Sequence, residues 1–243
     1  MQREMQSTNE VRNKCAAGES QAQYAHRLIE EMIVTLVLPP GSRISEQALS
    51  VQLGIGRTPV REALQRLAYE RTIKIVPRSG IIVSDIDLAA HFKLIELRRE
   101  VERILVMRAA RFAEPIDCRN FLQLAERFEA AADANDANLF ISADAELNAL
   151  LATVADNSYA AAAMAPLQAQ TRRIWYLNYQ AFGDVSTVSR LHAAIARAVA
   201  QKDEKQASDA MDALINHVEN YTYRTIDLLK KKPLAAPAVS EGK

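Results

Sequence analysis

The sequence predicts a mainly α-helical protein, with an N-terminal winged helix-turn-helix followed by a C-terminal antiparallel helical bundle of about six helices. The composition favours helices, since Ala and Leu are abundant and only 7 Gly and 8 Pro occur in 243 residues. Residues 20–86 show the pattern helix, helix, turn, helix, hairpin. Residues 87–231 show helical periodicity with almost no strand pattern. We expect residues 1–19 and 232–243 to form a disordered arm and tail.

The first two helices of residues 20–86 are indicated by apolar spacing and by turn residues. Apolar side chains recur at helical spacing over 21–37, and the turn at 39–41 should end that helix. Ser45 or its neighbour can cap a short second helix, which Gly54 stops.

A third helix and a hairpin complete this region. Thr58 is expected as the N-cap of the helix, with Pro59 at its first position. Isoleucine and valine then alternate with other residues on both sides of the turn at 77–80, which predicts a two-stranded hairpin with a wing tip.

The second region divides into six helical stretches separated by short breaks at Pro, Gly, Asn and Asp. Short connections favour antiparallel neighbours in a bundle. The expected helices lie near 87–113, 116–134, 136–155, 157–181, 185–201 and 204–230.

Charge is distributed unevenly along a chain whose net charge is zero. Residues 57–78 carry six basic and two acidic side chains, whereas residues 87–243 carry 19 basic and 21 acidic ones. A basic face on one small unit is typical of a nucleic-acid-binding domain.

The third helix presents polar side chains opposite its apolar face. Arg57, Arg61 and Gln65 follow one another at a spacing of four residues. Arginine can donate two hydrogen bonds to O6 and N7 of guanine, and the free N–H groups of a helix start near Thr58 favour a phosphate. The other interpretation of these arginines is an ordinary solvated helix surface.

The stretch PPGSRISEQALSVQLGIGRTPVREALQRLAYERTIKIVPRSGIIV resembles the DNA-binding head of the GntR regulators. The resemblance implies that Arg57 and Arg61 read bases and that Glu62 orients them, while Thr58 and Gly80 approach the DNA backbone. Two positions depart from the family pattern: Gly56 replaces a Ser, and Arg71 replaces a Gly, which should alter the turn into the wing. The expected DNA-binding residues are Arg57, Thr58, Arg61, Glu62, Gln65, Arg66, Arg78 and Gly80.

Three later stretches resemble the ligand-binding (FCD-type) domain of the fatty-acid-regulator branch of that family: ELRREVERILVMRAARFA, DAELNALLATVADNSY and RLHAAIARAVAQKDEKQASDAM. Many members of this branch bind a divalent metal through one Asp and three His. Here Asp144 and His192 stand at two of these positions, Asn148 replaces the first His, and Leu214 stands at the last position. Because two imidazoles are missing, we expect no metal, although Asp144, Asn148 and His192 would be its ligands if one were bound.

The bundle is expected to hold a small effector with a carboxylate. By the resemblance Arg98 faces the pocket, and Arg172 lies beside Trp175 on the helix of the bundle wall. A buried guanidinium needs an anionic partner, which is either a ligand carboxylate or an internal Asp144, Glu146 or Glu102. Trp175 has the alternative role of core packing. The expected effector-binding residues are Arg98, Asp144, Asn148, Arg172, Trp175 and His192.

These features predict a cytoplasmic homodimer that binds double-stranded operator DNA and a small organic-acid-like effector. A ligand-binding helical protein without DNA-binding activity is the alternative. No G-x-S-x-G, P-loop or G-x-G-x-x-G motif occurs, so we do not expect an enzyme. We also expect no membrane contact, because no signal-peptide core and no long apolar run occur.

Overall fold

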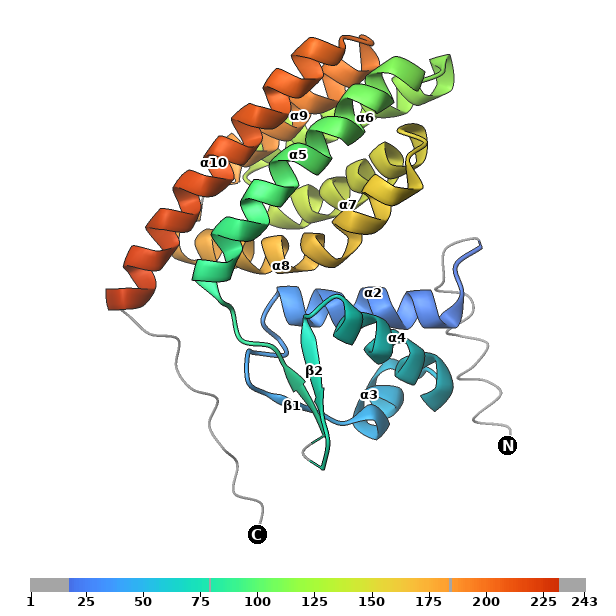
Figure 1. The fold of residues 1–243 in the computed structure, drawn as a ribbon, viewed down its shortest axis with the longest axis vertical. Helices are drawn as coiled ribbons and strands as arrows, with labels where there is room; N and C mark the ends of the chain where they lie inside the picture. The colour runs from blue at the N-terminus through green and yellow to red at the C-terminus, as the bar shows by residue number, and fades with distance from the viewer. Residues whose placement is uncertain (1–17, 79, 184, 232–243) are drawn as a thin grey trace. The chain divides into compact units, whose positions relative to one another are not determined.

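The computed structural model describes residues 18–78, 80–183 and 185–231, and confirms a mainly helical fold. The expected arm and tail, apart from residues 18 and 19, lie outside the described residues. The chain divides into two compact units, with residues 169–173 of a long helix grouped with the first unit and the boundary otherwise between residues 86 and 87. Figure 1 shows the helices and strands of both units.

The first unit is a winged helix-turn-helix. Its helices are α2 (Gln21–Val34), α3 (Glu46–Leu53) and α4 (Arg57–Tyr69). Its antiparallel sheet has the order β1-β3-β2, from β1 (Arg43–Ile44), β2 (Ile73–Val76) and β3 (Gly80–Val83). The two-residue strand β1 was not predicted, because it is too short to show an alternating pattern. Fully buried apolar side chains of its core include Ala25, Ile29, Ile33, Val60, Leu67 and Val83.

Helix ends in this unit follow the predicted caps in one case and differ in another. The Ser45 side chain accepts a hydrogen bond from the Ala48 N–H at the start of α3, and Gly54 ends that helix at φ 66°. The expectation of Thr58 as N-cap and Pro59 at the first position of α4 is wrong, because Gly56 is the N-cap. Pro59 instead takes the third position of the first turn, where its missing N–H leaves no helical bond unmade.

The second unit is a six-helix bundle, close to the predicted limits. The helices are α5 (Leu88–Phe112), α6 (Pro115–Ala134), α7 (Ala137–Val154), α8 (Ser158–Phe182), α9 (Ser186–Ala200) and α10 (Glu204–Lys231). Helix α6 packs against α9, and α5 packs against α10 (Figure 1). Large side chains such as Phe121, Phe128 and Ile195 are fully buried between them, so a tightly packed core holds the interior polar groups in place.

The turn that follows α4 contains Arg71 in the left-handed region, with φ 61°. Its N–H donates to the Ala68 carbonyl, and the Thr72 N–H donates to the Leu67 carbonyl, as in the helix-end motif that normally carries glycine. We expect Arg71→Gly to raise the free energy of unfolding by about 0.5–1 kcal/mol, because glycine adopts this backbone without strain. Urea unfolding measures the change. Arg71→Ala is the control, and equal stability of the two variants would contradict the strain.

Candidate functional site

Helix α4 has one buried and one exposed face, as its amphipathic sequence predicts. Val60, Leu64 and Leu67 pack into the core of the first unit. On the other face the Arg57 and Arg61 side chains are 65% and 58% exposed. The packed face fixes the helix, so the two guanidiniums project from a rigid support.

A single carboxylate holds both arginines. Arg61 donates from Nε and Nη2 to the two oxygens of Glu46, at 3.1 and 2.7 Å, and Arg57 Nε lies 3.8 Å from the same side chain. The hydrogen bond from Arg61 lowers the pKa of Glu46. Glu62, which was expected to orient the arginines, makes no hydrogen bond or ion pair with either of them among the described residues. Both guanidiniums are more than half exposed and Glu46 is 21% exposed, so these ion pairs contribute little to stability.

The other expected DNA-binding residues surround this pair. Thr58 and Gln65 are exposed on α4, and Arg66 is exposed but donates from Nε to Glu70 at 3.0 Å. Arg78 and Gly80 have positive φ of 65° and 87° and flank Ser79, which lies outside the described residues. The backbone therefore turns sharply at the end of the hairpin, where Gly80 allows close approach.

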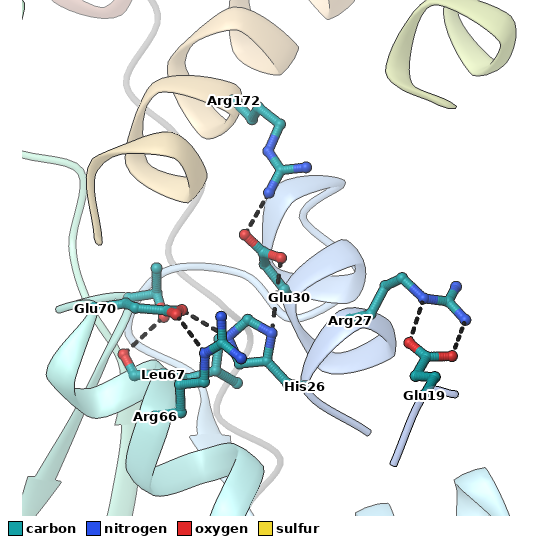
Figure 2. Close-up of polar contacts among 9 residues, drawn as sticks. Glu19, His26, Arg27, Glu30, Arg66, Leu67, Glu70 and Arg172 are labelled. Carbon is teal, nitrogen blue, oxygen red and sulfur yellow. Dashed lines mark hydrogen bonds and ion pairs between the residues drawn. The ribbon is translucent and has the colours of Figure 1, made fainter. Parts of the chain in front are cut away.

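A buried contact between His26 and Glu70 joins α2 to the end of α4 (Figure 2). His26 Nε2 lies 2.7 Å from a Glu70 carboxylate oxygen, and Arg66 donates to the other oxygen. His26 and Glu70 are both buried. Sequence reasoning missed this pair because 44 residues separate its members.

Arg172 does not join the other expected effector-binding residues. It belongs to the segment of α8 that groups with the first unit, and its guanidinium forms an ion pair with Glu30 of α2 (Figure 2). Its anionic partner is thus an internal carboxylate, although not one of those considered from the sequence.

Three other expected residues do come together inside the bundle. His192 Nε2 lies 3.3 Å from Asp144 Oδ1, and Asn148 donates from Nδ2 to the same oxygen at 3.0 Å. His192 Nδ1–H donates a hydrogen bond to the Val188 carbonyl at 2.7 Å, and Nε2 faces Asp144. These contacts hold a carboxylate, an amide and an imidazole in one fixed arrangement on α7 and α9.

Aromatic rings enclose this polar group. The rings of Phe128 and Phe140 each lie 5.2 Å from the His192 ring, and Trp175 packs on Phe140 at 4.7 Å. Trp175 therefore forms part of the wall around Asp144, Asn148 and His192, and it is itself 5% exposed. The rings leave the His192 and Asp144 side chains only 10% and 11% exposed, and this low exposure strengthens the interactions between them.

Arg98 pairs with Glu102, one turn further along α5. Its Nε and Nη2 make three hydrogen bonds of 2.9–3.1 Å to the carboxylate, and both side chains are buried. Burial by itself would lower the pKa of Arg98, but the charge and hydrogen bonds of Glu102 raise it above its usual value. The remaining Arg98 Nη1 is buried without a hydrogen-bond partner.

A partly open cavity of about 200 Å³ adjoins the polar residues, between α5, α7, α8 and α10. Its wall is mostly Ala, Leu and Met, and its polar residues are Glu102, Asn148 and Gln168. Asn148 also contacts Asp144, and Glu102 contacts Arg98, so two of the polar residues in the cavity wall are bonded to buried polar groups behind it. An apolar pocket with a few fixed polar groups is the usual form of a small-molecule site.

The residues present do not fit a divalent metal. Asn148 turns its N–H₂ donor toward Asp144, and Leu214 stands buried where the resemblance placed the last histidine. No group of three His, Cys, Asp or Glu able to hold a metal occurs in the described ranges. A zinc site normally has three or four protein ligands, which Asp144 and His192 cannot supply.

His91, on the same face of α5 as Arg98, makes stability depend on pH. Burial, with the nearby Arg98 charge, lowers the pKa of His91 from 6.5 to about 4. Between about pH 4 and pH 6.5, His91 therefore carries a proton in the unfolded chain and none in the folded chain. The free energy of unfolding falls as pH decreases through this range, by up to about 3 kcal/mol. Urea unfolding across this range should show that loss in the wild type and a flatter profile in His91→Leu. Identical profiles would contradict the assignment.

The two sites define a class of protein: a transcription regulator with a winged-helix DNA-binding head and a helical ligand-binding domain. Residues 21–83 match the family described as bacterial regulatory proteins of the gntR family, and residues 93–217 match the FCD domain. The chain therefore belongs to the GntR family of DNA-binding transcription regulators and carries an FCD effector-binding domain.

Several relatives support this assignment. The HTH-type transcriptional repressor RspR of Escherichia coli K12 is 27% identical over 189 residues, which cover 78% of this chain and 83% of the relative. The regulator McbR of the same strain is 30% identical over 105 residues, covering 43% of this chain and 48% of the relative. The relatives named here are transcription regulators.

Solved structures show the same fold. That of E. coli McbR/YncC has a TM-score of 0.74 at 18% identity and covers 86% of this chain and 99% of its own. A putative GntR regulator from Rhodococcus sp. RHA1 has a TM-score of 0.62 at 19% identity, with 86% and 99% covered.

Among the described helices, none is long and apolar enough to span a membrane.

Proposed function

We propose that this regulator acts in the cytoplasm as a homodimer, and that a small carboxylate-bearing effector in the bundle controls its affinity for operator DNA. The observation that carries the DNA-binding part is the exposed pair Arg57 and Arg61 on a helix whose opposite face is buried. Two heads of a dimer would meet successive half-sites of a pseudo-palindromic operator. No catalytic step is part of this function.

In the proposed complex α4 enters the major groove. Arg57 and Arg61 leave Glu46 and donate to guanine O6 and N7, while Gln65 reaches a neighbouring base edge. Thr58 at the helix start, Arg66, and the wing residues Arg78 and Gly80 contact phosphates. Glu62 is exposed on the same helix and takes part only if DNA binding brings it to the arginines.

In the bundle, the proposed effector lies in the cavity with its carboxylate on Arg98. Asn148, Asp144 and His192 provide the polar contacts, the Val188 carbonyl orients His192, and Trp175 closes the aromatic wall. Arg172 is not part of this set, because Glu30 holds it. An effector that prefers one arrangement of the dimer by about 1–3 kcal/mol changes operator affinity about 5- to 150-fold.

A gel-shift titration with DNA from upstream of the protein's own gene tests the DNA-binding part. The wild type and Arg197→Ala, which removes an arginine of the bundle surface paired with Glu129, should bind equally. Arg61→Ala should bind more weakly than both while its circular dichroism stays native. A wild type that ignores this DNA would favour the alternative of a ligand-binding protein without DNA-binding activity.

A thermal-shift panel of small carboxylic acids tests the effector part. At least one acid should raise the unfolding midpoint of the wild type and change its operator affinity in the gel shift. The same acid should act more weakly on His192→Ala. If neutral compounds stabilise the protein and acids do not, the carboxylate in the proposal is wrong.

A further inference from the structure

The buried Arg98–Glu102 pair adjoins the cavity through Glu102, and Arg98 lies close enough to Asp144 for the two charges to interact. Glu102 is part of the cavity wall, whereas Arg98 is not among the lining residues and contacts Glu102 through Nε and Nη2. We propose that Glu102 competes with the effector for Arg98. Its carboxylate occupies the position on the guanidinium that the effector carboxylate takes when it binds. The inference rests on the proposed function, and it makes Glu102 the residue that sets the affinity of the site for anions.

The lining of the cavity supports this role. The polar side chains that line it are a carboxylate and two amides, and no Lys, Arg or His of the described residues belongs to its wall. An incoming carboxylate therefore finds no cationic side chain in the wall itself, and it reaches Arg98 only where Glu102 moves away from the guanidinium. A site with this lining binds simple anions weakly as long as the internal pair is closed.

The Arg98 guanidinium has hydrogen-bond donors that Glu102 does not use. Arg98 Nη1 is buried and has no hydrogen-bond partner, so its donors are unused in the closed pair. A guanidinium binds a carboxylate best through two parallel hydrogen bonds, and a second carboxylate can supply these when it replaces Glu102. Because the cavity is partly open, water can reach the Glu102 carboxylate once it has turned away.

The exchange of Glu102 for an effector carboxylate determines which ligands bind, because the two ion pairs with Arg98 are similar in free energy. Replacing one charge-assisted pair by another gives little net gain, so a carboxylate alone is a poor effector. A ligand gains affinity only through the rest of its surface, against the Ala, Leu and Met wall. Glu102 thus discriminates effectors that fill the cavity from the small anions of the cell.

Removal of the competitor by Glu102→Ala, followed by addition of sodium acetate, tests the inference in the full-length protein. The variant should unfold at lower temperature, and acetate at constant ionic strength should restore its midpoint in a saturable way. The apparent acetate affinity should be at least about tenfold higher than that of the wild type. Chloride and the neutral analogue acetamide should not restore it.

The chain offers a matched control in Glu129, which accepts the same three hydrogen bonds, from Nε and Nη2 of Arg197. The Arg197 and Glu129 side chains are 43% and 40% exposed, and neither lines the cavity. Glu129→Ala should show no saturable acetate response. If Glu102→Ala does not fold, Glu102→Gln takes its place with the same comparison, because the amide keeps the volume and one acceptor oxygen.

Two results would overturn the inference. Acetate that stabilises neither the variant nor the wild type would mean that an external carboxylate cannot reach Arg98. Equal stabilisation of both would mean that Glu102 does not compete. Operator binding is measured in the same samples: wild-type protein that binds no operator refutes the proposed function, whereas intact binding with no acetate response refutes this inference alone.

Discussion

Replacing both Arg57 and Arg61 with alanine is expected to weaken operator binding by at least about 30-fold. Each bidentate contact between arginine and guanine contributes about 1–3 kcal/mol of discrimination, so loss of two contacts costs about 2 kcal/mol or more. The fold should survive, since both side chains are more than half exposed and their ion pairs with Glu46 lie at the surface.

Fluorescence anisotropy at fixed salt concentration measures this loss. The matched control is Arg111→Ala, since Arg111 also donates from Nε and Nη2 to one carboxylate, that of Glu204, but lies in the second unit. It should bind like the wild type. A third variant, Glu46→Gln, should bind at least as well as the wild type, because it weakens the hold on both arginines. Wild-type affinity in the double alanine variant would exclude this face of α4 from DNA reading.

Replacing Arg98 with methionine is expected to lower the free energy of unfolding by about 3–5 kcal/mol. The change leaves the Glu102 carboxylate, which is 6% exposed, without its cationic partner. An unpaired charge inside a protein is far more costly than an absent pair. Arg98→Met also removes the proposed anchor of the effector, so effects on stability and on ligand binding must be measured separately.

A double-mutant cycle in urea separates the pair from the packing. Arg98→Met combined with Glu102→Leu should regain most of the lost stability, because no charge is then left buried. Arg111→Met, at the exposed pair with Glu204, should cost less than about 1 kcal/mol. A double variant as unstable as Arg98→Met alone would show that the carboxylate is not the source of the cost.

The helices of the bundle could be predicted because their ends coincide with strong local signals. Pro115 starts α6, and Asn135 and Gly183 end α6 and α8 in the left-handed conformation. The start of α4 could not be predicted to the residue, since Gly56 and Thr58 are both acceptable N-caps. The hydrogen bond from the Val60 N–H to the Gly56 carbonyl decides between them.

Side-chain partners were predictable only where they lie close in sequence. The pair of Arg98 with Glu102 was among the alternatives because an i, i+4 spacing places both on one face of a helix. The contact of Arg61 with Glu46 spans 15 residues and depends on the angle between α3 and α4. That of Arg172 with Glu30 spans 142 residues, and no local pattern indicates it.

Operator binding by the full-length protein is the most direct measurement, made by footprinting on DNA from upstream of its own gene over a range of salt concentrations. We expect two protected half-sites whose centres are about one helical turn, or a multiple of it, apart, with affinity that falls steeply as salt increases. Methylation of guanine N7 within the half-sites should block binding by the wild type. Binding no tighter than to random duplex DNA at the same salt concentration would contradict the assignment of α4 as a base-reading helix.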